Sequence, residues 1–290
     1  MRTTRTRLGT LALAAGCVLC TSIGWGEEKS EEKKADGGKI VVDGSTTVGP
    51  IAKAFAEYYM KANPGVNITV SESGSGNGAK SLINSTCDVA TMSRFMKIEE
   101  AKAAIDKGVF PTPFIVAIDG IAVVVHPGNP VKGLSIEQVR DIYTGKITHW
   151  SGVGGPDKEI VVISRDTNSG TYESFNLLVL KETKVAQSAE YVGSNGQMRQ
   201  RVQSTPTAIG YVGHGFVDRT VKALDINKIP ADRNTIVSGR YPIARPLFMF
   251  TNGCPALGSH LYSFATLYLS KKGQEIVEAI GFVPVTQYTK

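Results

Sequence analysis

The hydrophobic positions of the chain follow two different periods, in short stretches that alternate. Residues 40–42 are continuously apolar and residues 66–70 alternate between apolar and polar, as buried and half-buried strands do. Between them, residues 50–62 repeat apolar side chains at helical spacing. The same alternation of strand and helix patterns continues to the end of the chain. It predicts an α/β fold with a largely parallel sheet, and the number of repeated units favours two lobes over one large sheet.

The remaining elements follow from the same two periods, and several have clear end signals. Pro50 suits the first turn of a helix, and Ser135-Ile136-Glu137-Gln138 spells a capping box. We expect further strands at residues 89–92, 114–126, 160–163, 209–212 and 247–250. We expect further helices at residues 79–85, 98–105, 136–143, 169–180, 261–269 and 274–279.

The first 26 residues carry the pattern of a secretory signal peptide. Arg2, Arg5 and Arg7 precede any acidic residue, and an apolar run follows at residues 8–24. A membrane anchor is the alternative, but the run is short and glycine-rich for a membrane span. We therefore expect cleavage before Glu27 and export to the periplasm.

A lipid anchor at Cys17 is a second alternative, because Ala14-Ala15-Gly16-Cys17 loosely matches a lipoprotein cleavage box. The apolar run continues past Cys17, which favours plain cleavage. Residues 27–38 are mostly charged, end in glycine and lack large apolar side chains. This composition predicts a flexible tether between the signal peptide and the folded part.

The composition excludes several classes of protein. Hydrophobic residues make up 42% and charged residues 20%, which excludes a disordered chain and a polytopic membrane protein. The formal charge is +6, but the arginines of the signal peptide supply half of it, and a mature charge this small argues against nucleic-acid binding. The four histidines are isolated, and the chain has neither a G-x-S-x-G motif nor a notable pair of spaced carboxylates. We expect no catalytic residue, no metal site and no cofactor.

Two cysteines, Cys87 and Cys254, remain once the signal peptide is removed. In an oxidising compartment they could form a disulfide. Two separate thiols fit the sequence equally well, because spacing along the chain does not give a distance in space. Both alternatives stay open at this point.

Four loops rich in hydroxyls and glycine each follow a predicted strand and precede a predicted helix. They lie at residues 44–47, 73–76, 92–94 and 164–171. Ligands of open α/β sheets bind at the carboxyl ends of strands, so we expect these loops to meet at one site. Any one of them alone is ordinary helix capping. Four together, two with an arginine, predict a site for a tetrahedral oxyanion.

The fourth loop has the most specific spacing. Arg165 and Ser169 stand four residues apart at a helix entry. The guanidinium can fork onto two oxygens of an anion while amides and hydroxyls of residues 169–171 meet the others. The alternative is a surface arginine paired with Asp166.

Taken as a set of motifs, the chain resembles the extracytoplasmic phosphate-binding subunit of bacterial ABC phosphate importers. The resemblance covers about residues 39–288. It rests on DGSTTVGP at 43–50, SGSGNGAK at 73–80, DVATMSR at 88–94, AIDGIAVVVHPGNPV at 117–131, LSIEQVRDIYTGKITHW at 134–150, ISRDTNSGTYESF at 163–175, AIGYVG at 208–213 and GFVPV at 281–285.

This resemblance implies a two-lobed periplasmic-binding-protein fold of type II, with a ligand cleft between the lobes. It implies a receptor rather than an enzyme, which binds inorganic phosphate with high affinity and delivers it to the membrane permease of an ABC importer. We expect a monomer. Two alternatives remain, a receptor for another oxyanion such as sulfate or molybdate and a secreted hydrolase of phosphate esters.

The resemblance also predicts the division of the chain into lobes. Lobe one comprises residues 39–122 and 246–290, and lobe two comprises residues 123–245. The crossing segments at residues 121–126 and 244–250 form the hinge.

The expected phosphate contacts follow position by position from the family motifs. A well-known branch of the family has an aspartate near Ser93, whereas this chain has Ser93-Arg94, and we include both residues in the predicted site. Asp119 is then the expected carboxylate that accepts the phosphate O–H, and the alternative is a turn residue before Gly120. The other predicted contacts are Thr46, Thr47, Ser75, Arg165, Ser169, Gly170 and Thr171.

Overall fold

A computed structural model describes residues 38–286 of the chain. The predicted signal peptide at residues 1–26, the alternative lipid anchor at Cys17 and residues 27–37 of the predicted tether lie outside this range. Within the described range, no helix has both the length and the apolar character that crossing a membrane requires.

The strands of the described range form a nine-stranded sheet and a separate pair of short strands. At one end of the large sheet the order is β2-β1-β3, with all three strands parallel. At the other end the order is β8-β6-β7, again parallel. The bounds are β1 Lys39–Gly44, β2 Asn67–Ser71, β3 Val89–Met92, β6 Val161–Arg165, β7 Glu190–Val192 and β8 Ala208–Gly213.

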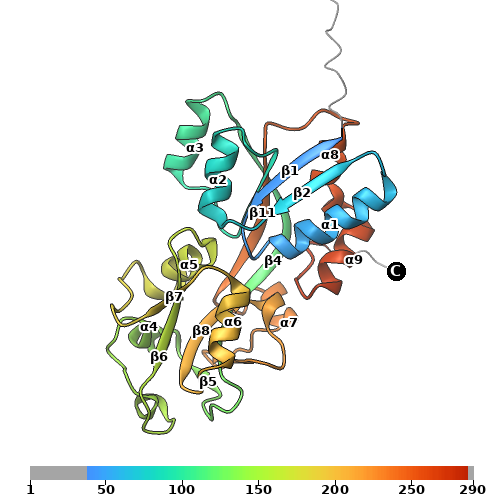
Figure 1. Cartoon of the computed structure of the whole chain (residues 1–290). Coiled ribbons are helices and arrows are strands. Elements are labelled where there is room, and N and C mark those ends of the chain that lie inside the picture. The colour runs from blue at the N-terminus through green and yellow to red at the C-terminus, as the bar shows by residue number, and fades with distance from the viewer. Residues whose placement is uncertain (1–37, 287–290) are drawn as a thin grey trace, which may run out of the picture. The chain divides into compact units, whose positions relative to one another are not determined.

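Two long strands, β4 (Pro111–Val125) and β11 (Ala244–Asn252), join these ends (Figure 1). Residues 111–120 of β4 pair antiparallel with β11, whereas residues 121–125 pair antiparallel with β8. The expectation of a largely parallel sheet is therefore wrong at its centre. The physical reason is that β4 carries the chain from one lobe to the other, and β11 brings it back alongside in the opposite direction.

The short strands complete the second lobe. The strand β9 pairs with the end of β4, and β5 and β10 pair with each other in parallel. Their bounds are β5 Gly133–Leu134, β9 Lys222–Ala223 and β10 Asp225–Ile226.

Helices pack around both ends of the sheet (Figure 1). The α-helices are α1 Gly49–Ala62, α2 Ser75–Ile83, α3 Ile98–Ile105, α4 Ile136–Tyr143, α5 Gly170–Phe175, α6 Asn195–Gln203, α7 Arg233–Val237, α8 His260–Ala265 and α9 Lys271–Ala279. A π-helix extends α5 over Asn176–Leu180, and 3₁₀ helices cover Trp150–Val153, His214–Phe216 and Leu267–Leu269.

Most predicted elements are confirmed, and the differences have local reasons. The helix α2 begins at Ser75, inside the glycine-rich stretch that was expected to be a loop. At Gly78 a side chain would not fit, because a Cβ there would lie 2.7 Å from the Cα of Gly44. The helix α6 was not predicted, since Met198 and Val202 are its only buried large apolar residues.

The hydrophobic core changes where the chain crosses between lobes. Ala117 and Leu247 pack in the core of the first lobe, with α1, α8 and α9. Ile121, further along β4, and Ile243, directly before β11, pack in the core of the second lobe, with α4. Residues 38–286 contain two such hydrophobic clusters in each lobe, and β4 and β11 connect the lobes of this α/β fold.

The two cysteines of the described range are separate thiols. Cys87 is buried and Cys254 is exposed, and neither forms a disulfide. Burial raises the pKa of Cys87 to about 12, and the nearby carboxylates of Asp43 and Asp88 add to the effect. Of the two alternatives left open by the sequence, the structure shows the unpaired one.

Candidate functional site

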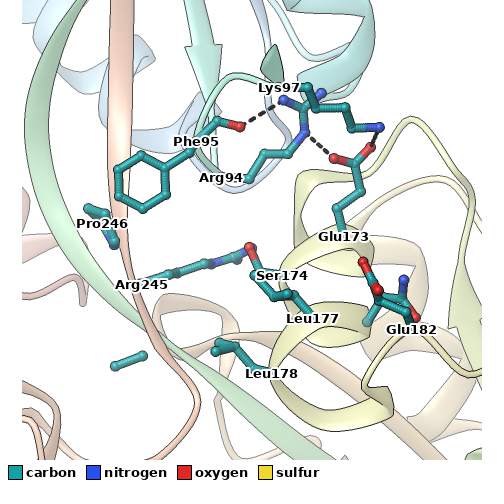
Figure 2. Close-up of a pocket in the computed structure, with 12 residues that line it drawn as sticks. Arg94, Phe95, Lys97, Glu173, Ser174, Leu177, Leu178, Glu182, Arg245 and Pro246 are labelled. Carbon is teal, nitrogen blue, oxygen red and sulfur yellow. Dashed lines mark hydrogen bonds and ion pairs between the residues drawn. The ribbon is translucent and has the colours of Figure 1, made fainter. Parts of the chain in front are cut away.

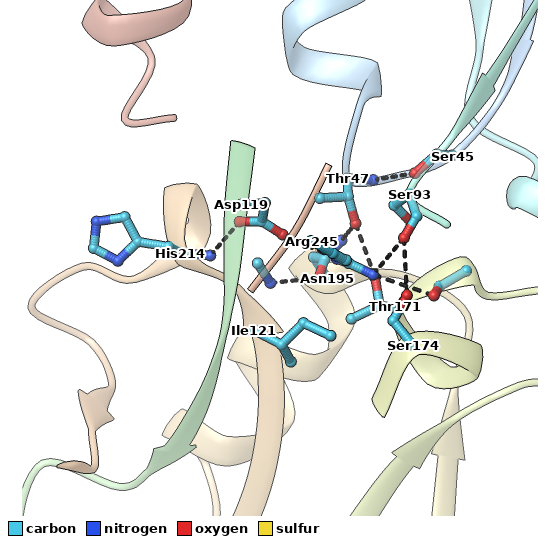
Figure 3. Close-up of polar contacts among 12 residues, drawn as sticks. Ser45, Thr47, Ser93, Asp119, Ile121, Thr171, Ser174, Asn195, His214 and Arg245 are labelled. Atoms are coloured by element: carbon cyan, nitrogen blue, oxygen red, sulfur yellow. Dashed lines mark hydrogen bonds and ion pairs between the residues drawn. The ribbon is translucent and has the colours of Figure 1, made fainter. Parts of the chain in front are cut away.

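The loop after β1 turns sharply into α1 and presents two threonines. Ser45 Oγ accepts hydrogen bonds from the backbone N–H of Thr47 at 3.1 Å and of Val48 at 3.3 Å, which tightens the turn (Figure 3). Thr46 and Thr47 are both buried. Thr47 Oγ1 lies 2.9 Å from Thr171 Oγ1, which belongs to α5 of the other lobe. Predicted site residues 124 positions apart are therefore in contact.

Arg165 ends β6 and is 1% exposed. Its backbone N–H donates to the hydroxyl of buried Tyr211 at 3.0 Å, which holds the strand end in place. Its Nε donates to the carbonyl of Val192 at 3.1 Å, and its Nη2 donates to the carbonyl of Gly193 at 2.8 Å and to Thr46 Oγ1 at 3.2 Å.

The third nitrogen of this guanidinium is unsatisfied. Arg165 Nη1 is buried and has no hydrogen-bond partner, and none of the ion pairs among residues 38–286 includes Arg165. Burial lowers the pKa of this guanidinium below its ordinary value, although arginine remains protonated at neutral pH. The first lobe and the second lobe thus enclose a cation with one unused donor group.

Ser75, Ser93 and Gly170 meet beside these threonines. Ser75 Oγ accepts the backbone N–H of Ser93 at 3.1 Å and lies 3.3 Å from Ser93 Oγ. A Cβ at Gly170 would lie 2.4 Å from Ser75 Oγ, so this close approach of the two lobes requires glycine. Ser169 caps α5, with its Oγ accepting the N–H of Tyr172 at 3.2 Å.

Arg245, on β11, is a central residue that the sequence analysis did not select. Its Nη1 donates to the carbonyls of Ser93 at 2.8 Å and Gly170 at 3.1 Å, and its Nη2 donates to Thr171 Oγ1 at 3.0 Å (Figure 3). It lies in the crossing segment that was predicted as a hinge, and an arginine directly before the apolar run at residues 246–250 was the available sequence signal.

Asp119 lies opposite Arg245 in the register of β4 and β11. Arg245 Nη2 donates to Asp119 Oδ2 at 2.9 Å, and the backbone N–H of His214 donates to Asp119 Oδ1 at 2.9 Å. Burial raises the pKa of this carboxyl above its ordinary value, against the opposing effect of the Arg245 guanidinium. Each carboxylate oxygen therefore already has a donor from the protein.

Arg94 does not join the cluster, although it follows Ser93 directly. Its guanidinium forms ion pairs with Glu100 of α3 and with Glu173 of α5. Ser93 therefore contacts Ser75, whereas the side chain of Arg94 contacts these carboxylates.

Asn195 is a second residue that the sequence analysis missed. It is fully buried at the start of α6, and its Nδ2 donates to Thr46 Oγ1 at 3.2 Å and Thr47 Oγ1 at 3.0 Å. Its Oδ1 accepts the N–H of Gly213 at 3.2 Å. Ser194-Asn195-Gly196 follows β7 as the other polar loops follow their strands, so the same rule applied once more would have found it.

The assembled site has a simple charge balance. Arg165 and Arg245 are both buried, and Asp119 is the one carboxylate that pairs with either of them in the described part of the chain. The surrounding groups are neutral hydroxyls and amides, which add no charge. No group of three or more metal-ligating side chains occurs among residues 38–286. The arrangement suits a small anion that can receive hydrogen bonds from several sides.

Comparison with known proteins agrees with this geometry. The model of the PBP superfamily domain matches residues 29–272. The chain belongs to the PBP superfamily. The phosphate-binding protein PstS of Staphylococcus saprophyticus is 32% identical over 296 residues, which cover 97% of this chain and 91% of that protein. PstS of Borreliella burgdorferi is 32% identical over 265 residues, covering 87% and 92% respectively. Identity at this level places the chain among the PstS-like members of the superfamily.

Solved structures show the same relationship. A substrate-binding protein assigned to a phosphate ABC transporter of Clostridium perfringens, solved with bound phosphate, aligns with a TM-score of 0.80 and 32% identity. The alignment covers 86% of this chain and 100% of that one. An ABC-type phosphate transport receptor from Vibrio cholerae aligns with a TM-score of 0.70, also at 32% identity, over 84% of this chain and 99% of that one. The predicted two-lobed fold of type II is confirmed.

Proposed function

We propose that this protein is an extracytoplasmic receptor that binds one inorganic phosphate ion between its lobes and delivers it to the membrane permease of an ABC importer. The observation that carries the proposal is Arg165, whose buried guanidinium lacks a carboxylate partner and has an unused Nη1 group. A buried charge without a counter-ion is costly. A bound anion supplies the missing counter-charge, and Arg165 Nη1 donates a hydrogen bond to that anion.

The neutral groups of the site explain why phosphate fits. A hydroxyl can both donate and accept a hydrogen bond, so it suits an ion that carries both P–O⁻ and P–OH groups. Arg245 and Asp119 form a fixed pair that holds the carbonyls of Ser93 and Gly170 in place, and Arg94 acts outside the site. The proposed contacts of phosphate are Thr46, Thr47, Ser75, Ser93, Arg165, Ser169, Gly170 and Thr171.

The relatives support the same function. The Staphylococcus saprophyticus and Borreliella burgdorferi relatives are named phosphate-binding protein, and the Clostridium perfringens structure contains phosphate. The relatives named above are binding proteins and a transport receptor, which argues against the secreted hydrolase. The proposal also includes export to the periplasm by an N-terminal signal peptide that is cleaved before Glu27. It further includes that the receptor is a monomer.

The lobes of the proposal have the boundaries predicted from the sequence. Lobe one comprises residues 39–122 and 246–290, and lobe two comprises residues 123–245. The change of hydrophobic core between Ala117 and Ile121 and between Ile243 and Leu247 supports crossings at these positions. Contacts such as Thr47 with Thr171 join the lobes around the ligand, so opening and closing at the crossings admits and releases it.

Isothermal titration calorimetry of the purified protein with phosphate, sulfate and molybdate tests the proposal. We expect saturable binding of one phosphate per chain, and much weaker binding of the other two oxyanions. Absence of phosphate binding would overturn the proposal. Tighter binding of sulfate or molybdate would replace it with a receptor for that anion.

A further inference from the structure

A second buried charged network lies next to the candidate site and is not explained by it. Arg94 donates from Nη1 to Glu100 Oε2 and from Nη2 to Glu100 Oε1, both at 2.7 Å. These two residues belong to the first lobe, since Arg94 follows β3 and Glu100 lies on α3. They form a forked ion pair that is complete within one lobe.

Glu173 brings the second lobe into this network. Its Oε2 forms an ion pair with Arg94 Nε, and its Oε1 lies 3.0 Å from Lys97 Nζ (Figure 2). The side chains of Arg94 and Glu173 are 6% and 17% exposed, whereas Lys97 is 50% exposed. Glu173 thus forms ion pairs with two cationic side chains, and both belong to the opposite lobe.

The surroundings strengthen this contact between lobes. The network borders a cavity of about 460 Å³ whose lining includes Phe95, Leu177, Leu178 and Pro246 (Figure 2). Apolar walls lower the local dielectric, so a pair of opposite charges there attracts more strongly than it would at an open surface. The walls come from both lobes, as the ion pairs do.

The network is connected to the candidate site through the backbone. Arg94 follows Ser93, and Glu173 lies two residues after Thr171 on the same short helix. Ser174 Oγ donates to the carbonyl of Ser93 at 3.2 Å, a further bond between the two segments. The two segments that meet at the candidate site therefore also meet here, through different side chains.

We propose that Glu173 is a positioning residue that stabilises the closed arrangement of the lobes and thereby raises phosphate affinity without touching phosphate. The inference rests on the proposed function. When the lobes separate, Glu173 loses both cations, while Arg94 keeps its pair with Glu100. The ion pairs of Glu173 therefore favour the closed state and slow the release of ligand.

This role makes a kinetic prediction that a purely structural role does not. The pairs form only once the lobes have closed, so Glu173→Gln leaves the association rate of phosphate nearly unchanged and raises the dissociation rate about tenfold. Lys97→Met removes only the exposed partner, so it raises the dissociation rate about two- to threefold. In the double variant, the dissociation rate rises by less than the product of the two single effects, because both substitutions remove the ion pair between Glu173 and Lys97.

Glu190→Gln is the matched control. Glu190 accepts from Arg201 Nε at 2.6 Å and Nη2 at 2.8 Å, and both residues lie in the second lobe. The same substitution there removes an arginine pair that does not join the lobes, and we expect no change in phosphate kinetics. Stopped-flow fluorescence with inorganic phosphate measures both rate constants for all five proteins, and thermal unfolding shows whether each is folded.

The outcomes separate this inference from the proposed function. If wild type does not bind phosphate, the proposed function fails and this inference fails with it. If wild type binds phosphate and Glu173→Gln dissociates at the same rate, the inference alone is overturned. If Glu173→Gln does not fold, Lys97→Met decides alone: an unchanged dissociation rate overturns the inference, and a two- to threefold faster dissociation supports it.

Discussion

Arg165 and Arg94 are both buried arginines at the junction of the lobes, but their surroundings differ. Arg94 forms ion pairs with two carboxylates, Glu100 and Glu173. Arg165 donates only to carbonyls and to Thr46 Oγ1, and it keeps one nitrogen without a partner. The charge of Arg94 is neutralised by carboxylates of the protein itself, whereas the charge of Arg165 is not.

This difference assigns different roles to the same residue type. A neutralised arginine holds structural elements together and has no remaining charge to offer a ligand. An arginine held by neutral acceptors is fixed in position and still carries its charge, which is what recognition of an anion needs. Proximity of an arginine to a polar loop is therefore a weak criterion, and the charge balance around it is the stronger one.

The largest expected effect on stability comes from Arg94. In Arg94→Met, two partly buried carboxylates lose their main partner, so we expect the free energy of unfolding to fall by about 3 kcal/mol. Urea unfolding of the ligand-free protein measures it. As a control, Asp218→Asn breaks the exposed pair of Asp218 with Arg199, and the change there is below about 1 kcal/mol. Equal effects of the two substitutions would show that the network around Arg94 is not a structural one.

Arg165→Met separates binding from stability. Loss of a charge-assisted partner of the anion costs about 2–5 kcal/mol of binding. The affinity for phosphate then falls at least about thirtyfold, since each 1.4 kcal/mol is tenfold. The stability of the ligand-free protein changes by less than about 1 kcal/mol, because removal of an unpaired buried charge offsets the lost hydrogen bonds.

Calorimetry and urea unfolding of the same Arg165→Met sample check both statements. If its unfolding free energy falls as far as that of Arg94→Met, the contrast between the two arginines is wrong. If its phosphate affinity stays near that of wild type, Arg165 is not the group that meets the anion.

The smallest expected effect concerns the cysteines and involves no loss of function. Burial keeps the thiol of Cys87 from solvent and raises its pKa to about 12, so that the thiol stays protonated at pH 8. Cys254 is exposed, so we expect iodoacetamide to label it in the native protein and to label Cys87 only after unfolding. Peptide mass spectrometry distinguishes the two sites. Labelling of both at equal rates would contradict the burial of Cys87.

Much of the site could be predicted from local sequence alone. The strands β1, β2, β3 and β6 each end at a polar loop, and the rule that ligands gather at carboxyl ends of strands brings these loops together. Thr46, Ser75, Ser93 and Arg165 were found in this way. The capping box at Ser135 was also predicted, because its hydrogen bonds join residues three positions apart.

The sequence leaves a residue's contacts open where they depend on a distant partner. Asp119 and Arg245 are 126 positions apart, and only the pairing of β4 with β11 brings them together. Arg94 could not be told from Arg165 in the sequence, since one of its two carboxylate partners, Glu173, comes from the other lobe.

By itself, the sequence determined the alternation of strands and helices and the polar loops at the strand ends, and it predicted a site for a tetrahedral anion. These properties depend on periodicity and on neighbouring residues, so they can be read locally. The tertiary structure decided the antiparallel crossing of β4 and β11, the separation of Cys87 from Cys254 and the charge balance of each buried arginine. The physical reason is that the energy of a buried charge is set by whichever groups the fold places within a few ångströms, wherever they lie in the chain.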